Sequence, residues 1–264
     1  SFDNNIFSKG ISEVEFEALL GDTNHPLFNR SIKGLYPSGS TIKPVIALAA
    51  LEEGIVNRWT SIVSVGGIKV SKWFFPDWKA GGHGPTNITK AIAESVNTYF
   101  YFIGGGYENF KGLGVEKITK YASLAGMGKA TGIDLPGEEE GLLPNEEWKE
   151  KTKNEAWYIG DTYHMAIGQG DMLVTPLQVA QWTAMIANGG SLYAPHLVRS
   201  ITKEECVIVQ KINPTKIHGD IFSSDNIKII QEGMRETIRT GSARSLLDLP
   251  IKVAGKTGTA QWSS

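Results

Sequence analysis

The residues best suited to chemistry form three short groups in order along the chain: Ser40-Thr-Ile-Lys43, Ser95-Val-Asn97 and Lys256-Thr-Gly258. If Ser40 opens a helix, Lys43 lies on the same face one turn later, within hydrogen-bond reach of the Ser40 hydroxyl. A buried lysine whose pKa is lowered can take the serine proton as a general base, and the positive helix N-terminus favours the resulting anionic oxygen. This arrangement predicts a serine nucleophile that a lysine activates.

Each group also has an imitation elsewhere in the chain: Ser200–Lys203, Ser224-Asp-Asn226 and Arg239-Thr-Gly241. The first lies in a strand-and-turn pattern, in which the serine and lysine side chains point apart. The second fits a helix N-cap, and the third fits a helix end with a cationic last turn and a terminal glycine. Taken singly, the three chosen groups also have structural interpretations, as an N-cap, a helix terminus and a strand end. Their joint order favours the set that begins at Ser40.

The elements that must position these groups are mostly helical. Capping residues and terminal glycines predict helices over 40–53 (closed by Gly54), 87–95, 114–125, 176–188 and 224–239. Strand-like segments are few, at 206–210 and at 251–254 leading into Lys256. We therefore expect a helix-rich chain with too few strands to build a sheet of its own.

Composition is that of an ordinary globular domain, with 41% hydrophobic and 20% charged residues among 264. The net charge of −2 gives no reason to expect a nucleic-acid partner. The longest apolar stretches, such as 44–51, are far shorter than the roughly 20 residues of a membrane helix, so we expect neither a membrane helix nor a signal peptide within these residues. The single cysteine, Cys206, excludes an internal disulfide, and we expect it to be a small buried side chain.

The residues around Ser40 carry a family resemblance. Leu35-Tyr-Pro-Ser-Gly-Ser-Thr-Ile-Lys-Pro44 resembles the nucleophile box of class B penicillin-binding proteins, especially the penicillin-binding protein 2 branch. The similarity continues through Ser95-Val-Asn-Thr-Tyr-Phe-Tyr101, Gly132-Ile-Asp-Leu-Pro-Gly137, Ile167-Gly-Gln-Gly170, Thr175-Pro-Leu-Gln178 and Val253-Ala-Gly-Lys-Thr-Gly-Thr-Ala-Gln261. These matches cover essentially the whole chain.

The resemblance implies an α+β fold of the penicillin-binding-protein and β-lactamase type, with a helix-rich lobe packed on an antiparallel sheet. The activity implied is that of a peptidoglycan D,D-transpeptidase, which cross-links stem peptides through an acyl-enzyme and is inhibited covalently by β-lactams. Ser40 would be the nucleophile and Lys43 its base, while Ser95 and Asn97 would relay the proton and hold the substrate amide. The substrate carboxylate would bind at Lys256, Thr257, Gly258 and Thr259, and the backbone N–H groups of Ser40 and Thr259 would form the oxyanion hole.

The same resemblance implies the partners: the D-Ala-D-Ala end of a stem peptide, β-lactam antibiotics and membrane-anchored wall-synthesis proteins such as a glycosyltransferase. It places the catalytic domain at the bacterial cell membrane, facing the periplasm or cell exterior. Residues 1–264 are expected to form one transpeptidase domain that is incomplete at both ends. Most sheet strands, the membrane anchor and the pedestal domain of the family are expected to lie outside it, so the resemblance does not imply that this fragment is active by itself.

Three alternatives remain open at this stage. A β-lactamase would need a base for deacylation, and Glu140 lies in a near match to the glutamate motif of class A enzymes, with Pro144 where an asparagine belongs. A β-lactam sensor or scaffold of the same fold would keep the motifs without the transfer reaction. Asp77 and His83 are possible zinc ligands, but Val96 cannot bind a metal, so we expect neither metal nor organic cofactor.

Overall fold

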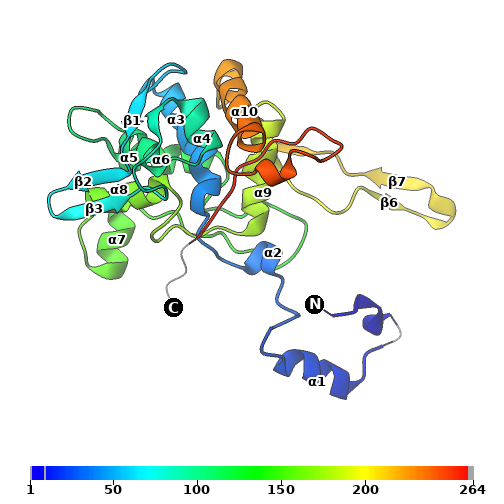
Figure 1. Cartoon of the computed structure of the whole chain (residues 1–264). Helices are drawn as coiled ribbons and strands as arrows, with labels where there is room; N and C mark the ends of the chain where they lie inside the picture. Colours follow the sequence, from blue (N-terminus) through cyan, green and yellow to red (C-terminus); the bar gives the residue numbers. More distant parts are fainter. Residues whose placement is uncertain (1, 9, 261–264) are drawn as a thin grey trace.

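A helix that is apolar on every side, α3 (Lys43–Glu52), lies at the centre of the fold in the computed structural model, which describes residues 2–8 and 10–260. Residues 43–51 are all buried. A helix without a polar face must be covered by its neighbours, and α3 contacts four other helices (Figure 1). These are α4 (Ile88–Ala93), α5 (Asn97–Gly105), α6 (Gly114–Leu124) and α10 (Ser224–Arg239).

The remaining helices pack around this centre or lead into it. They are α1 (Glu13–Gly21), α2 (Arg30–Lys33), α7 (Glu146–Lys153), α8 (Ile159–Ala166) and α9 (Pro176–Ala187). Short 3₁₀ turns are η1 (Asn4–Phe7), η2 (Gly39–Ile42), η3 (Glu204–Cys206) and η4 (Arg244–Leu246).

The strands pair only in twos within the described part of the chain, and all four pairs are antiparallel. The pairs are β1 (Ile62–Ser64) with β4 (Gly84–Thr86), β2 (Gly67–Val70) with β3 (Trp73–Pro76), β5 (Leu192–Ala194) with β8 (Thr215–His218) and β6 (Ser200–Thr202) with β7 (Ile208–Lys211). This confirms the expected α+β class with an incomplete sheet.

Four of the five predicted helices are confirmed within two residues at each end, because capping residues mark their limits. Asn87 accepts a hydrogen bond from Lys90 N at the start of α4, and Thr175 forms a capping box with Gln178 at the start of α9. Ser223, rather than Ser224, caps α10. Two of the three imitation motifs are therefore ordinary parts of α10, and the third, at Ser200, lies in β6.

Three predictions about local structure were wrong. Ser40 does not belong to the α-helix α3. It lies in the 3₁₀ turn η2, and Ile42 is the N-cap of α3. Residues 251–254 form no strand, and no described strand lies beside them to supply hydrogen bonds. Cys206 is exposed, in a turn of the β6–β7 hairpin, instead of buried.

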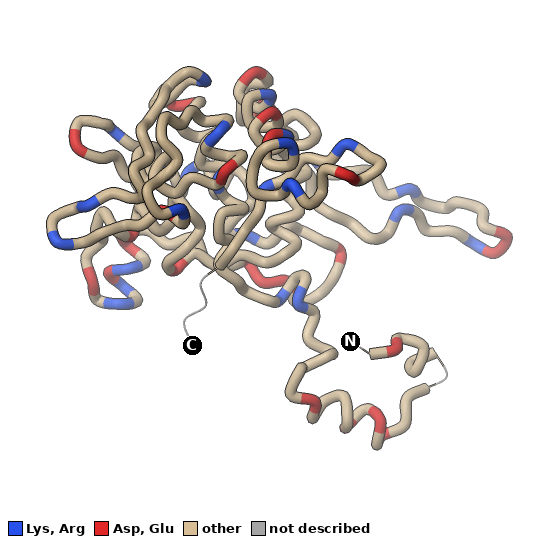
Figure 2. The backbone as a smooth tube through the Cα atoms, in the orientation of Figure 1, with Lys and Arg blue, Asp and Glu red and all other residues tan. Residues whose placement is uncertain are grey.

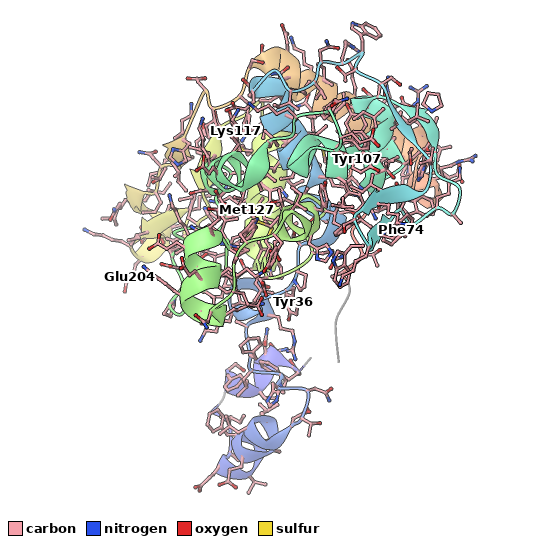
Figure 3. All side chains as sticks on the ribbon, turned by 90° about the vertical axis from the view of Figure 1, so that its left-hand side faces the viewer. Tyr36, Phe74, Tyr107, Lys117, Met127 and Glu204 are labelled. Atoms are coloured by element: carbon pink, nitrogen blue, oxygen red, sulfur yellow. The ribbon has the colours of Figure 1, made fainter. Side chains whose placement is uncertain are left out.

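Two segments project from the helical body (Figure 1). One is the N-terminal arm with α1, which leaves the body close to Tyr36 (Figure 3). The other is the β6–β7 hairpin. Basic and acidic residues are interspersed over the body and the β6–β7 hairpin, whereas the described residues of the N-terminal arm before Arg30 include acidic residues and no Lys or Arg (Figure 2). Among the described helices, none has the length and apolarity needed to span a bilayer.

Candidate active site

Ser40 lies in the 3₁₀ turn η2, directly before the central helix. Residues i and i+3 eclipse one another in a 3₁₀ turn, so Ser40 and Lys43 share a face as predicted. The Lys43 backbone N–H donates to the Ser40 carbonyl and closes the turn. Ser40 is half-buried, and its hydroxyl makes no hydrogen bond to another described residue. The predicted bond between this hydroxyl and Lys43 is thus not formed in this structure.

Lys43 is fully buried and directed at the second motif. Its Nζ donates to the Ser95 carbonyl at 2.9 Å and to Asn97 Oδ1 at 2.6 Å, and it lies 3.3 Å from Ser95 Oγ. Burial lowers the pKa of Lys43 well below its usual range, the charge of Lys256 adds to this effect, and the charge of Asp77 opposes it. The fold therefore favours a neutral amine at this position, the form that can act as a base.

Ser95 and Asn97 lie on the turn that joins α4 to α5. Ser95 has a positive φ of 58°, and Asn97 is the first residue of α5. The helix α4 ends at Ala93, two residues before its predicted end at Ser95, and Glu94 is its C-cap. The turn places the Ser95 hydroxyl and the Asn97 amide on the same lysine.

The segment 256–259 lies without regular structure against the Ser40 turn. A Cβ on Gly39 would lie 2.7 Å from the Thr259 carbonyl oxygen, and one on Gly258 would lie 2.7 Å from Thr41 Cγ2. Thr257 Oγ1 is bonded to Ser242 Oγ at 2.7 Å. Burial lowers the pKa of Lys256 to about 7. All three predicted groups thus converge on the N-terminal end of α3.

Two residues of the turn at 168–169 belong to the site, although the motif search gave them no role. Gly39 N donates to the Gly168 carbonyl at 2.8 Å, and Gln169 Nε2 donates to the Thr259 carbonyl at 3.0 Å. Residues 167–170 were noted only for their resemblance. The two glycines at 168 and 170 were the signal that could have indicated this turn, because glycine allows another backbone segment to approach closely.

Asp77 and His83, considered above as zinc ligands, are engaged with protein groups instead. Asp77 accepts hydrogen bonds from Thr98, and His83 Nδ1 lies 2.6 Å from Glu94 Oε2. Val96 is buried beside the Ser95 turn. No group of three or more potential metal ligands occurs among residues 2–8 and 10–260.

The whole chain, residues 1–264, matches the model of the penicillin binding protein transpeptidase domain. The chain belongs to that family. It is 38% identical over 266 residues to the peptidoglycan D,D-transpeptidase MrdA of Acinetobacter baumannii, covering 100% of this chain and 38% of the relative. The structural predictions drawn from the resemblance, family and fold, are therefore confirmed.

Solved structures of penicillin-binding protein 2 share the fold of this family member. One from Pseudomonas aeruginosa, in complex with WCK 5153, has a TM-score of 0.86 and 33% identity, over 99% of this chain and 58% of that one. Another, from Helicobacter pylori in complex with MreC, has a TM-score of 0.82 and 38% identity, and the match covers 96% of this chain and 45% of that one. The chain thus spans less than two thirds of the length of these relatives.

Proposed function

We propose that the protein containing this chain is a peptidoglycan D,D-transpeptidase that works through an acyl-enzyme on Ser40. The observation that carries the proposal is the buried Lys43, bonded to both Ser95 and Asn97 and three residues after the serine. The family match and the MrdA relatives support the same activity.

The first half of the reaction needs a base for the Ser40 proton. A neutral Lys43 has two N–H groups and one lone pair; the Ser95 carbonyl and Asn97 Oδ1 take up the N–H groups. The lone pair remains for the Ser40 proton as Ser40 Oγ bonds to the carbonyl carbon between two D-alanines. The N–H groups of Ser40 and Thr259 would then stabilise the tetrahedral oxyanion, at about 3 kcal/mol for each donor.

The second half returns the proton. The C–N bond breaks, and the leaving D-alanine takes the proton from Lys43 through the Ser95 hydroxyl, which lies 3.3 Å from Nζ. An amine of a second stem peptide then attacks the acyl carbon, and its proton passes through the Ser95 hydroxyl to Lys43. The ester bond between the acyl carbon and Ser40 Oγ breaks, and Oγ takes the proton back from Lys43, which restores the free serine. Lys256 and Thr257 would bind the substrate carboxylate with charge-assisted hydrogen bonds.

The substrates and partners follow from this activity. A β-lactam carries a carboxylate beside a strained amide, so the same residues would bind it and Ser40 would hold it as a slowly hydrolysed acyl-enzyme. Relatives occur in complexes with MreC and in a peptidoglycan synthase complex that couples polymerization to crosslinking. We extend both kinds of partner to this protein, with its catalytic domain facing the periplasm or cell exterior.

The full-length protein, given a donor peptide ending in D-Ala-D-Ala and an amine acceptor, should release D-alanine and form the cross-linked product. Mass spectrometry follows both products, and Ser40→Ala should abolish both. Sustained turnover of a penicillin without cross-linking would show a β-lactamase instead. Acylation by penicillin with no reaction on the peptide would show a sensor.

A further inference from the structure

Ser95 is held in a conformation that a serine rarely adopts. Its φ of 58° lies in the left-handed region, which costs a residue other than glycine of order 1 kcal/mol or more. Such a conformation persists only where its surroundings fix it. On one side Lys43 bonds the Ser95 carbonyl. The residues that flank this turn, Glu94 and Thr98, are bonded by residues 77–83, the segment between β3 and β4, which we term the clamp loop.

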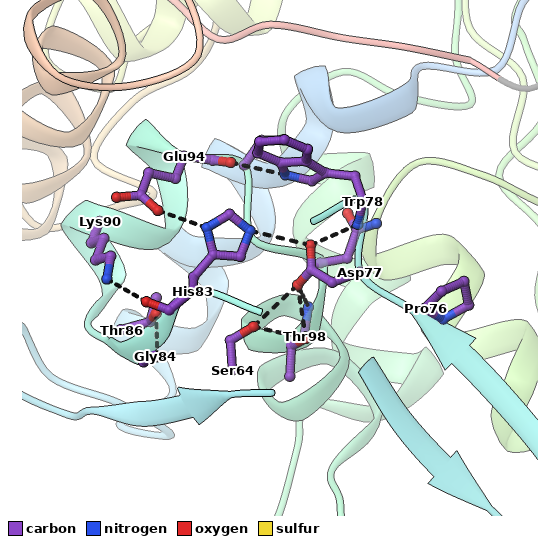
Figure 4. A network of polar contacts seen from close by, with 12 residues as sticks. Ser64, Pro76, Asp77, Trp78, His83, Gly84, Thr86, Lys90, Glu94 and Thr98 are labelled. Carbon is purple, nitrogen blue, oxygen red and sulfur yellow. Dashed lines mark hydrogen bonds and ion pairs between the residues drawn. The ribbon is translucent and has the colours of Figure 1, made fainter. Parts of the chain in front are cut away.

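The clamp loop contacts Glu94, the residue before Ser95, at two points (Figure 4). Trp78 Nε1 donates to the Glu94 backbone carbonyl at 3.1 Å, and His83 Nδ1 lies 2.6 Å from Glu94 Oε2. The Trp78 and His83 rings pack edge to face, with centroids 5.2 Å apart. The main chain and the side chain of Glu94 are therefore both fixed next to the strained serine.

Asp77 holds the residues after Ser95. The N-cap of α5 is Val96, whose side chain cannot accept a hydrogen bond, so the exposed N–H groups of the helix need another acceptor. The Asp77 carboxylate supplies it, accepting from Thr98 N at 2.8 Å and Thr98 Oγ1 at 2.7 Å. A buried negative charge at a helix N-terminus also interacts favourably with the helix dipole.

The clamp loop is itself fixed to the strand next to it. Asp77 N donates to the Gly66 carbonyl at 2.8 Å, and His83 N donates to the Ser64 carbonyl at 3.1 Å. Gly82 has a φ of 79°, and a Cβ there would lie 2.2 Å from the Ser64 carbonyl oxygen. The loop is thus hydrogen-bonded at both ends, to the end of β1 and to the turn that follows it.

We propose that Asp77 is a positioning residue for acyl transfer: its carboxylate caps α5 and, with Trp78 and His83, the clamp loop holds Ser95 and Asn97 against Lys43. This inference rests on the proposed function for its catalytic consequence. Its structural part, the capping of α5, stands independently of that function.

The charge of Asp77 also acts on the base. The charge of Lys256 lowers the pKa of the buried Lys43, and the charge of Asp77 raises it. Removing the charge of Asp77 while keeping the cap should therefore lower the pKa of Lys43 further. The neutral base would then appear at lower pH, and the acid limb of acylation would move to lower pH.

The test measures single-turnover acylation of the full-length protein by a fluorescent penicillin, together with hydrogen–deuterium exchange over residues 94–99. Asp77→Ala should lower the maximal acylation rate by about tenfold or more, with a change of less than about threefold in half-saturating penicillin. Hydrogen–deuterium exchange over residues 94–99 should be faster in Asp77→Ala than in the wild type. Asp77→Asn keeps an acceptor for Thr98, so it should recover most of the rate, with its acid limb at lower pH.

Asp134→Ala is the matched control, because its carboxylate also accepts two backbone N–H groups, those of Leu197 and Val198, in another part of the fold. It should leave the acylation rate and its pH profile unchanged. If Asp77→Ala does not fold, Asp77→Asn and Trp78→Phe, which removes only the donor to Glu94, take its place.

Wild-type rate, pH profile and exchange in these Asp77 and Trp78 variants would overturn the proposal. Faster hydrogen exchange over residues 94–99 with an unchanged acylation rate would overturn the catalytic part of the proposal. The capping of α5 by Asp77 would still stand. A wild-type protein that penicillin does not label would instead overturn the proposed function and remove the catalytic part with it, while the exchange data would still decide the cap.

Discussion

At the scale of residues, the proposed chemistry depends on two lysines of lowered pKa. Burial lowers the pKa of Lys43 well below its usual range, and the three atoms that its Nζ hydrogen-bonds all belong to the Ser95–Asn97 turn. Lys256 is less buried, with a pKa of about 7. One lysine is suited to take a proton and the other to hold an anion, and different changes separate these roles.

Replacing Lys43 by methionine, which keeps most of the volume, should slow acylation by about 10²- to 10⁴-fold, because a general base contributes an effect of that size. Stopped-flow fluorescence of penicillin acylation measures it. Lys149→Met is the matched control, since Lys149 is also buried but pairs with Asp161. It should reduce stability and leave the acylation rate unchanged. A near-normal rate in Lys43→Met would remove Lys43 from the base role.

The carboxylate-binding role of Lys256 predicts an alkaline limb. As the pH rises through about 7, free Lys256 loses its charge, so the second-order rate constant for acylation should fall. Lys256→Arg keeps its charge throughout, because the guanidinium pKa exceeds about 12. The limb should therefore vanish from the pH profile of this variant, whatever its absolute rate. An alkaline limb that stays in place would assign the titration to another group.

At the scale of elements, the site depends on close backbone approach between η2 and the turn after α8. Gly168 has a φ of 72°, and a Cβ there would lie 2.0 Å from the Gly39 carbonyl oxygen. Gly168→Ala should therefore displace the Ser40 turn. We expect a loss of about 1–3 kcal/mol in stability and a slower acylation rate.

Gly189→Ala separates the two causes of this effect. Gly189 has a similar positive φ of 90°, but nothing lies within 4 Å of its Cβ position. It should show the cost of the backbone conformation alone, measured by thermal unfolding, and no change in acylation. Equal effects of the two substitutions on acylation would contradict the packing described for Gly168.

The elements also show how far the sequence could predict the site. Helices with local signals, such as α9 with its Thr175 capping box and Gly189-Gly190 end, follow from neighbouring residues and were predicted. The start of α5 was not predicted, because the carboxylate that caps it belongs to Asp77, which lies 21 residues before the capped Thr98. The break between η2 and α3 was missed for a similar reason, since Gly39 is fixed by Gly168. Contacts distant in sequence leave no local pattern.

At the scale of the whole molecule, the chain folds into a helix-rich body that carries all three motif groups. It matches the transpeptidase model from end to end, yet covers only 38% of the A. baumannii relative. Apolar side chains on both projections are exposed, including Val14 at 77% and Ile208 at 61%. Activity is therefore best measured on the full-length protein.

The most direct test of the account labels full-length protein with a fluorescent penicillin, comparing wild type with Ser40→Ala and Ser200→Ala. Ser200 is a matched control because it also precedes a lysine by three residues, but lies in β6. We predict that Ser40→Ala abolishes covalent labelling and that Ser200→Ala leaves it unchanged. Labelling that survives Ser40→Ala and disappears with Ser200→Ala would contradict the assignment of the nucleophile.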